Sequence, residues 1–479
     1  MKISMRAVVS LFLCITSFWA AYGQKGEILA GVTQINITPE TGYPHYRNYG
    51  TGVDDSLFVK AIVFRQGNIK WGIAVCDLLW IEPGLSAEVR TRVAEKTGIP
   101  FGNLMLTATH THTGPAYEPD IYELNEHVRK SGVSAEQAVA KNGYPALLVE
   151  KITEALVSAH NRVVPVRLRS AKDSVGGLSF NRRFILKDGK VKTNPGRGNR
   201  DIVQAAGPVD PALDMVFVEK QSDGSLMGVV SNFAVHADTY GGTAFSADYP
   251  GVLDKNLREK IKGNFVSLFL QGASGDINHI DVRKNGVVLK TDSIGKRLAA
   301  HIAAKAPRAG LAGSPALGAV NEFVYLPLQS YNDDEKAWAN DGQALPKYGE
   351  TGLFQMRRPM KIRSLERMRA REAVPPTIES EPWALPLQVQ VFKLTNDLVI
   401  VGVPGEVFAE LGLAIRKASP FKMTMVVELT NVHIAYLPTS KAFLQGGYET
   451  LNSRLAPGGG ELLVESAVRQ LKQLKSQSK

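Results

Sequence analysis

The chain has 479 residues, 44% of them hydrophobic, only two cysteines and a formal net charge of +10. Stability must come from a large buried core, which excludes a small disulfide-stabilised scaffold. Basic residues are dispersed, and their densest stretch, 357–371, is interleaved with Glu366, so the charge is typical of solvated helical faces and excludes a nucleic-acid partner. No repeat of about 20 to 50 residues is visible, which excludes solenoids and propellers.

The first 23 residues have the pattern of a secretory signal peptide. Lys2 and Arg6 precede an apolar stretch from Ala7 to Ala20, which ends in small residues up to Gly23. The stretch is too short to span a membrane, and no later stretch reaches the roughly 18 apolar residues that a spanning helix needs. We therefore predict that residues 24–479 form an exported protein, periplasmic or secreted, with no integral membrane segment.

Cysteine usage excludes a disulfide within the mature chain. Cys14 lies in the predicted signal peptide, so Cys76 is left alone and cannot form a disulfide within the mature chain. Because Cys76 follows the apolar run from Trp71 to Val75, we expect it to be a small core residue and not a reactive thiol.

Short apolar runs that stop at polar clusters recur along the mature chain. The runs are Ile69 to Val75, Leu104 to Ala108, Leu226 to Val235, Phe265 to Leu270, Leu398 to Val403 and Met423 to Leu429. Helical stretches such as Pro145 to His160 lie between several of them, which predicts an α/β fold with mixed sheets and flanking helices. Ligands in such folds bind beyond the carboxyl ends of the strands, so the polar clusters predict one shared site.

The stretch from Gln329 to Pro382 differs from the rest. It is charged, punctuated by prolines and partly helical around residues 363–372. We interpret it as an insertion or lid within a single large catalytic domain and not as a separate domain.

The run that begins at Leu104 leads into a His-x-His pair. If the strand runs through the pair, its period of two places His110 and His112 on one face. Neutral imidazole is a favoured zinc ligand, and a pair of this kind on a strand is a common way to offer one or two of them. A polar strand end with hydrogen-bonded histidines would give the same pattern, so the pair alone leaves both interpretations open.

Two further groups favour the metal site. His236 ends another apolar run, and Glu406 precedes an amphipathic segment that begins at Val407. Taken alone, His236 is also typical of a core histidine, and Glu406 of a carboxylate in the first turn of a helix. Two histidines and a glutamate together would suit a zinc site with an open position.

Other histidine-based zinc sites can be compared by spacing. The metallo-β-lactamase pattern needs an acid and another histidine soon after His-x-His, but Thr113, Gly114 and Pro115 follow here. An amidohydrolase-type barrel also begins with His-x-His on a strand, and His236, His279 and Asp281 would then complete its site. That barrel, acting on a polar sugar conjugate or a lactone, is the structural alternative.

A series of short motifs follows in order from about Gly31 to the C-terminus. The motifs are Thr109 to Pro115 (Thr-His-Thr-His-Thr-Gly-Pro), Asn181-Arg182, Asn232 to His236, Ser246 to Gly251, Gly275-Asp276, Pro404-Gly405-Glu406, Asn431 to Tyr436 and Tyr448-Glu449. Their order and spacing resemble the catalytic domain of neutral/alkaline non-lysosomal ceramidases. The resemblance implies a hydrolase of N-acyl amides with zinc as its cofactor.

The resemblance also implies roles for individual residues. The implied zinc ligands are His110, His236, Glu406 and Tyr436. His112 would lie beside the metal, where it can hydrogen-bond the substrate carbonyl or the developing oxyanion, and Arg182 and Tyr448 would line the pocket. Without the resemblance, the two tyrosines are equally typical of packing and Arg182 of a surface salt bridge.

Two departures from the family pattern bear on the reaction. Alignment on Gly275-Asp276 puts Gly272 where ceramidases have a serine often assigned as the nucleophile, and Ser274 lies two residues later. The chain also ends soon after a predicted helix, Glu461 to Lys475, without the family's C-terminal β-sandwich. We therefore expect metal-activated water as the nucleophile, with a neighbouring carboxylate or histidine taking its proton.

The sequence thus predicts an exported zinc-dependent hydrolase that cleaves an amide or ester bond in a small-molecule or lipid-like acylated substrate. The alternative from another class is an exported zinc-binding protein of the same fold without turnover. Gly272 is the residue that favours this alternative.

Overall fold

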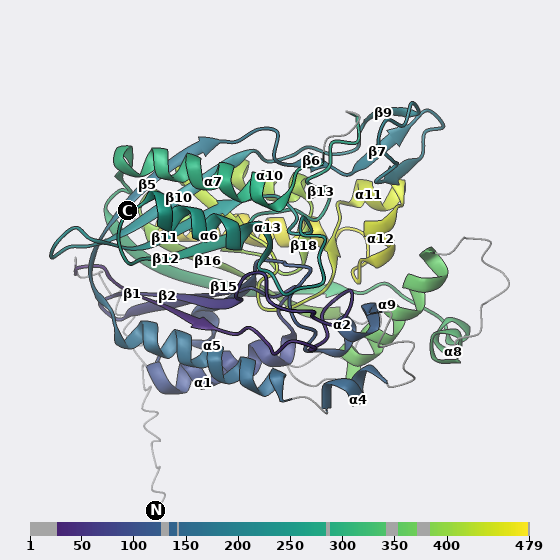
Figure 1. The fold of residues 1–479 in the computed structure, drawn as a ribbon, viewed down its shortest axis with the longest axis horizontal. Coiled ribbons are helices and arrows are strands. Elements are labelled where there is room, and N and C mark those ends of the chain that lie inside the picture. The colour runs from purple at the N-terminus through teal and green to yellow at the C-terminus, as the bar shows by residue number, and fades with distance from the viewer. Residues whose placement is uncertain are drawn as a thin grey trace, which may run out of the picture.

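The computed structural model describes residues 26–125, 134–140, 143–283, 288–341, 353–370 and 384–477. The predicted signal peptide lies outside the described residues. Among the residues described, no helix combines the length and the apolar character needed to cross a membrane. Two sheets pack face to face, and helices cover both outer surfaces (Figure 1).

The larger sheet has nine strands. Its path runs in the order β12 (Val266–Gln271), β11 (Leu226–Phe233), β10 (Ala212–Lys220), β5 (Val164–Ser174), β1 (Leu29–Asn36), β2 (Phe58–Gln66), β3 (Ile69–Cys76) and β4 (Leu104–Ala108), and β14 (Gly310–Leu311) pairs with β5. The pairs β3–β4 and β11–β12 are parallel. Parallel neighbours need crossover connections, which α1 (Pro83–Thr97) and α6 (Asp248–Lys260) provide.

The smaller sheet has four strands in the order β15 (Pro315–Pro327), β16 (Ala384–Thr395), β17 (Leu398–Gly402) and β19 (Met423–Val427). Its β17–β19 pair is parallel, and α10 (Ala409–Ala418) forms the crossover. The remaining strands are short: β6 (Phe180–Asn181), β7 (Arg183–Leu186), β8 (Val191–Thr193), β9 (Ile202–Ala205), β13 (Ile277–Asn278), β18 (Glu406–Val407) and β20 (Tyr436–Leu437).

Side chains of β2 show how the layers are built. Ile62 and Phe64 point to the core between the sheets, where Phe392 of β16 also packs. Val59 and Val63 point the other way, to the helices. A strand buried on both faces reads as a continuous apolar run and not as an alternating one, which explains the run pattern in the sequence.

The outer layers are helical. α1 and α5 (Tyr144–Asn161) cover the β1–β4 half of the large sheet, α6 and α7 (Thr291–Lys305) cover the β10–β12 half, and α10 and α13 (Gly459–Ser476) cover the small sheet (Figure 1). The predicted α/β class with mixed sheets and flanking helices is confirmed. None of the sheets formed by the described strands closes into a barrel, so the amidohydrolase-type alternative is wrong.

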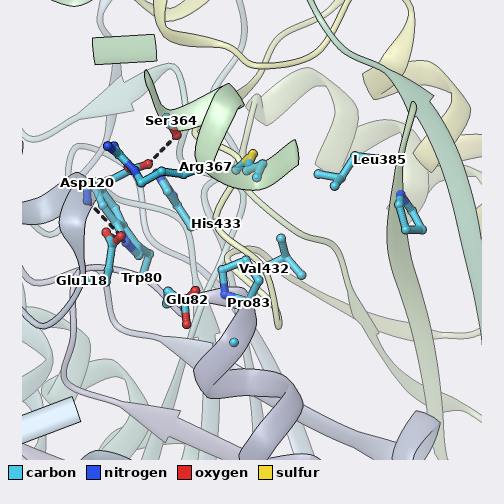
Figure 2. A pocket seen from close by; sticks show the side chains of 13 residues that line it. Trp80, Glu82, Pro83, Glu118, Asp120, Ser364, Arg367, Leu385, Val432 and His433 are labelled. Atoms are coloured by element: carbon cyan, nitrogen blue, oxygen red, sulfur yellow. Dashed lines mark hydrogen bonds and ion pairs between the residues drawn. The ribbon is translucent and has the colours of Figure 1, made fainter. Parts of the chain in front are cut away.

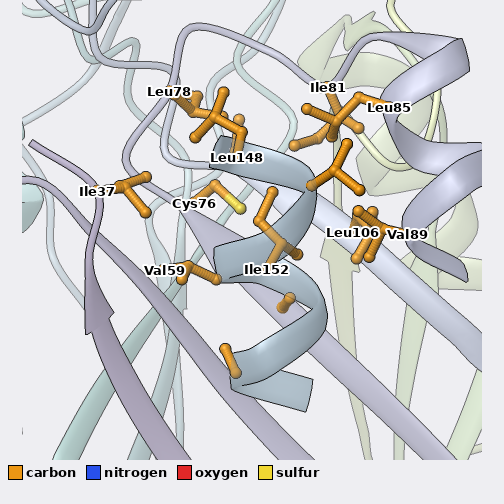
Figure 3. Packing of buried hydrophobic residues seen from close by; sticks show 14 of the residues in the cluster. Ile37, Val59, Cys76, Leu78, Ile81, Leu85, Val89, Leu106, Leu148 and Ile152 are labelled. Carbon is orange, nitrogen blue, oxygen red and sulfur yellow. The ribbon is translucent and has the colours of Figure 1, made fainter. Parts of the chain in front are cut away.

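Cys76 lies in the apolar cluster between β2, β4 and α5, next to Val59 and Ile152 (Figure 3). It is fully buried and forms no disulfide, and burial raises the pKa of its thiol. The prediction of a core cysteine is confirmed.

The predicted insertion contains two helices, α8 (Asp333–Asp341) and α9 (Leu353–Ala370). Residues 342–352 and 371–383 lie outside the described residues. α9 packs against α2 (Pro119–Leu124) and α12 (Tyr448–Asn452), at the end of the molecule that also holds α11 (Ser440–Gln445) (Figure 1). α4 (Ala135–Ala140) and the short 3-10 turns Phe101–Asn103 and Ala306–Arg308 complete the described elements.

Candidate metal centre and active site

The six apolar runs end at one place in the fold. Backbone hydrogen bonds join their ends: Thr109 N to Cys76 O (2.9 Å), Gly272 N to Phe233 O (2.9 Å), Glu428 N to Gln271 O (3.0 Å), Val403 N to Val427 O (2.9 Å) and Asn431 N to Leu106 O (2.8 Å). These bonds connect the ends of both sheets. The ends of the six runs therefore lie together, as the sequence analysis expected.

The His-x-His pair does not continue the strand as the period of two required. β4 ends at Ala108, and His110 has a φ of 69°, in the left-handed region that few non-glycine residues adopt. The turn nevertheless brings the rings of His110 and His112 together, with their centroids 4.9 Å apart. The prediction that the pair lies close was correct, but the reason given for it was wrong.

Three buried histidines converge on one point. The Nε2 atom of His236 lies 3.2 Å from Nε2 of His110 and 3.2 Å from Nε2 of His112. His110 donates from Nδ1 to the carbonyl of Leu79 (2.7 Å), and His236 donates from Nδ1 to the carbonyl of Ser274 (3.4 Å). These bonds leave the Nε2 lone pairs of His110 and His236 directed at the cluster, which is the arrangement that metal-binding histidines adopt.

Glu406 and Tyr436 lie next to each other on the short parallel strands β18 and β20, where they are direct register partners. A carboxylate oxygen of Glu406 is 3.5 Å from Nε2 of His110 and has no hydrogen-bond partner, although it is buried. Both side chains line the cavity that reaches the histidines. The structure therefore assembles all four residues implied as ligands, and adds His112 to the same cluster.

The donor set fits a zinc ion. The ligand atoms of the three histidines lie within 4.8 Å of one another. Close nitrogen lone pairs and a buried carboxylate oxygen without a donor are costly, unless a cation lies between them. Burial, then the charge of His110, lowers the pKa of both His112 and His236 well below its usual range, so both stay neutral. Burial also disfavours the charged form of His110, but Glu406, Glu428 and the carbonyl of Leu79 together outweigh it and raise the pKa of that imidazole.

A cavity of about 610 Å³ leads to the cluster. Besides His110, His112, Glu406 and Tyr436, its lining residues are Tyr46, Leu79, Trp80, Asp120, Glu123, Leu124, Arg357, Met360, Lys361, His433, Ala435, Tyr448, Asn452 and Arg454. Tyr448 is thus in the pocket wall, as the resemblance implied. The contribution of α9, through Arg357, Met360 and Lys361, is a feature that sequence reasoning missed. We call these three side chains the roof.

Arg182 occupies a different place from the one expected, because it does not line this cavity. It is buried behind Tyr436, with its guanidinium carbon 5.3 Å from the centre of that ring. It donates to Glu449 (2.8 Å) and to the carbonyl of Gly275 (2.8 Å). Arg182 therefore supports the loop and the tyrosine, and the expectation that it lines the pocket is corrected.

The serine that ceramidases carry has no counterpart that is free to react. A Cβ atom at Gly272 would lie 3.0 Å from the backbone of Phe233 and Ala234, so a side chain there would need a backbone shift. The hydroxyl of Ser274 donates to Glu428 and accepts from Gln271 Nε2 (2.9 Å). Packing therefore leaves no room for a side chain at Gly272, and hydrogen bonds occupy the hydroxyl of Ser274.

Glu428 is a second carboxylate that sequence reasoning missed. It is fully buried, and its side chain accepts from the backbone N–H groups of Ser274 (3.0 Å) and Val407 (2.7 Å). Burial raises its pKa to about 8. An acidic residue inside the apolar run from Met423 to Leu429 was the available signal for this residue.

A second cavity, of about 690 Å³, lies on the other side of an aromatic pair (Figure 2). The rings of Trp80 and His433 stack at 3.6 Å with an angle of 8° between them, and both residues line both cavities, as does Asp120. Apolar side chains, among them Val432 and Leu385, form much of the second cavity. The aromatic pair is a shared wall.

The His279 of the rejected barrel alternative is buried outside the histidine cluster. The metal ligands that the alternative required are therefore not brought together.

Comparisons with known proteins place the chain among its relatives. Residues 28–280 match the family model described as neutral/alkaline non-lysosomal ceramidase, N-terminal. The chain is 23% identical to the neutral ceramidase of Mycobacterium tuberculosis, over 85% of this chain and 70% of that protein. It is 24% identical to neutral ceramidase B of Dictyostelium discoideum, over 53% of this chain and 34% of that protein. The fold is similar to the crystal structure of the neutral ceramidase from Pseudomonas aeruginosa, with a TM-score of 0.65 and 19% identity, covering 94% of this chain and 75% of that one.

Proposed function

The chain belongs to the neutral/alkaline non-lysosomal ceramidase family, whose members are amide-bond hydrolases, and we propose that it is an exported zinc-dependent enzyme that hydrolyses N-acyl amides. The observation that carries the proposal is the convergence of three histidine Nε2 atoms beside the unpartnered carboxylate oxygen of Glu406. The proposed zinc ligands remain His110, His236, Glu406 and Tyr436.

The expected chemistry of the bound ion is simple. When zinc is bound in such a site, it polarises an acyl carbonyl and lowers the pKa of a water molecule to about 7. The chain must then orient the amide, move one proton and stabilise the oxygen that becomes negative.

His112 is suited to move the proton. Its imidazole is neutral because burial lowers its pKa, so Nε2 can take a proton from the attacking water. Its Nδ1 has no hydrogen-bond partner and lies 3.9 Å from a carboxylate oxygen of Asp238, which is itself paired with Arg47. The ring of Tyr46 packs edge-on against His112, with the centroids 4.8 Å apart, and holds its orientation.

The same proton completes the reaction. The water oxygen bonds to the acyl carbon, the carbon–nitrogen bond breaks, and His112 returns the proton to the departing nitrogen. While it is protonated, His112 is also a donor for the developing oxyanion. The products are a carboxylic acid and an amine. The closed positions at Gly272 and Ser274 support water, and not a serine, as the nucleophile.

The first experiment measures zinc content by mass spectrometry and hydrolysis of N-acyl amides of increasing polarity. We expect about one zinc per chain, and loss of both zinc and hydrolysis in His110→Ala. His301→Ala is the matched control, because this histidine of α7 pairs with Asp173 away from the cluster. A protein that holds zinc but cleaves no amide or ester would instead support the alternative of a binding protein without turnover.

Export is the other part of the proposal, and it is supported by the pattern of residues 1–23. Expression of the full chain and of a chain lacking these residues, followed by separation of cellular compartments, tests it. We expect only the full chain to leave the cytoplasm, and equal distribution of the two would contradict the proposal.

A further inference from the structure

The roof brings positive charge to the catalytic cavity. Arg357 and Lys361 are four residues apart on α9, so they lie on one face of the helix, and both line the cavity that contains His110 and Glu406. Nothing in the proposed reaction requires two basic side chains at this place. The question is therefore whether other groups of the protein already neutralise them.

Apart from Glu406, which belongs to the histidine cluster, the acidic residues of the cavity are paired with other cations. Asp120 pairs with Arg367 and with Arg454 (3.2 Å). Glu123 pairs with Arg363 (3.1 Å) and with Arg367 (2.7 Å). Both carboxylates thus fasten α9 to α2 and do not serve the roof.

Arg357 itself has no carboxylate partner in the described part of the chain. Its Nε atom is buried without a hydrogen-bond partner, and its guanidinium carbon lies 5.7 Å from the centre of the Tyr448 ring. Its other close neighbour is Tyr46, whose pKa is raised by burial, so that phenol is neutral. Arg357 hydrogen-bonds the side chain of Tyr46, but its buried Nε has no partner, so the planar guanidinium retains a donor for a planar anion.

Lys361 has the same deficit. Only 3% of its surface is exposed, and its ammonium donates to the neutral amide oxygen of Gln329 (2.7 Å). Burial, followed by the charges of Arg358 and Arg454, lowers its pKa to about 6. Glu335, the acidic group that acts on it from α8, is paired with Arg358 (2.7 Å). Lys361 is therefore mostly neutral near pH 7 in the empty cavity, and an anion bound there would raise its pKa and favour the charged ammonium.

We infer that the substrate carries an anionic group, a carboxylate or a phosphate, which Arg357 and Lys361 bind while the scissile amide lies at the histidine cluster. This inference rests on the proposed function for the reaction itself. It names the substrate class as acylated amines whose amine part is acidic, such as N-acyl amino acids or N-acyl aminoalkyl phosphates. The arginine fork would bind the anion through two hydrogen bonds, and that contact would orient the amide.

The test uses substrate pairs that differ in charge. N-Octanoylglycine is compared with N-octanoylglycinamide, and N-octanoyl-O-phosphoethanolamine with N-octanoylethanolamine, on the zinc-loaded full chain. We expect kcat/KM to be at least about tenfold higher for the anionic member of one pair or both, and the better pair identifies carboxylate or phosphate. In Arg357→Ala the anionic-to-neutral ratio should fall towards one, and Arg357→Lys should restore it only in part.

Arg369→Ala is the matched control, because Arg369 is an exposed arginine of the same helix that does not line the cavity. It should leave the ratio unchanged. Hydrolysis of both members of each pair at equal rates, or an unchanged ratio in Arg357→Ala, overturns the inference and leaves the proposed function intact.

Binding is measured as well, so that a failure of hydrolysis can be interpreted separately. If no amide is cleaved, the proposed function fails, and calorimetry with N-octanoylglycine and its amide on chelator-treated protein still tests the roof. Tighter binding of the acid, by about tenfold and dependent on Arg357, supports the anion site without a contribution from zinc. Equal binding of acid and amide overturns it.

Discussion

The histidine cluster and the roof face the same cavity, but they are held in different ways. The histidines stand on strand ends that backbone hydrogen bonds tie together, and two of their rings are oriented by main-chain carbonyls. The roof belongs to α9, which ion pairs from Asp120 and Glu123 fasten to the body of the molecule. The difference indicates that the reaction depends on the rigid core, whereas the choice of substrate depends on an attached helix.

The largest effect is expected from the core. His236→Ala removes the imidazole that lies 3.2 Å from both other histidines, so zinc should be lost and kcat should fall on the order of 10³-fold. Metal analysis and single-turnover hydrolysis check this. A variant that retains full zinc and activity would break the assignment of the reaction to the cluster.

The attachment of α9 comes next. Arg367→Ala removes a cation shared by Asp120 and Glu123, but Arg454 and Arg363 remain on these carboxylates, so we expect a loss of about 2 kcal/mol in unfolding free energy. KM for an anionic amide should rise roughly tenfold with zinc content unchanged and kcat nearly so. Steady-state kinetics and urea unfolding measure both.

The control for that variant is Arg92→Ala, which breaks an exposed pair with Glu88 on α1. It should change the unfolding free energy by no more than about 0.5 kcal/mol and leave KM unchanged. If Arg367→Ala lowered kcat as strongly as KM rose, the separation between reaction and substrate choice would not hold.

The absent serine provides a sharper test of the core. Gly272→Ser places a side chain 3.0 Å from the backbone of Phe233 and Ala234, so unfolding free energy should fall by about 1 to 3 kcal/mol without a gain in hydrolysis. Gly241→Ser is the control, because a Cβ at that exposed glycine meets nothing within 4 Å. A rise in hydrolysis in Gly272→Ser would show that a serine route is still accessible.

The smallest effect concerns the roof and pH. The pKa of Lys361 falls from about 10.4 in the unfolded chain to about 6 in the folded one. A depressed pKa contributes stability above the unfolded value, and that stability is lost as pH falls towards the folded value. Lys361→Met removes this loss, so its unfolding free energy relative to the wild type should rise by about 1 kcal/mol from pH 8 to pH 7.

Urea unfolding of both proteins at the two pH values gives the difference. The lost hydrogen bond to Gln329 shifts the variant by the same amount at both pH values and does not affect the slope. Arg358, Arg454 and Glu335 stay in place around the site, so a difference that is independent of pH would mean that Lys361 is charged in the folded state.

The core and its histidines were predictable because short-range pattern determines them. Apolar runs that are buried on both faces are read directly from the sequence, and each run ends in the polar residues that form the site. Even there, the path of the chain was not predictable: His110 turns through a left-handed conformation that a period-two strand excludes. The two imidazole rings still lie close together, as predicted, because the side chains approach each other across the turn.

The roof could be predicted only as a charged insertion. Which arginines of α9 are neutralised depends on carboxylates more than 200 residues away, such as the Asp120 partner of Arg367. The spacing of residues in the sequence does not predict such a pairing. The same limit explains Arg182. Its partner Glu449 was part of a recognised motif, but its contact with the ring of Tyr436 depends on how α12 and β20 pack together.

The stacked rings of Trp80 and His433 form a wall that separates the two cavities next to α9. A ligand could therefore be designed to bind one cavity without entering the other. A compound bound in the second cavity would contact Asp120, Arg367 and the Trp80–His433 pair, but none of the three clustered histidines. Such a compound would bind beside the Asp120–Arg367 ion pair that holds α9 to α2, and it would need no metal-chelating group.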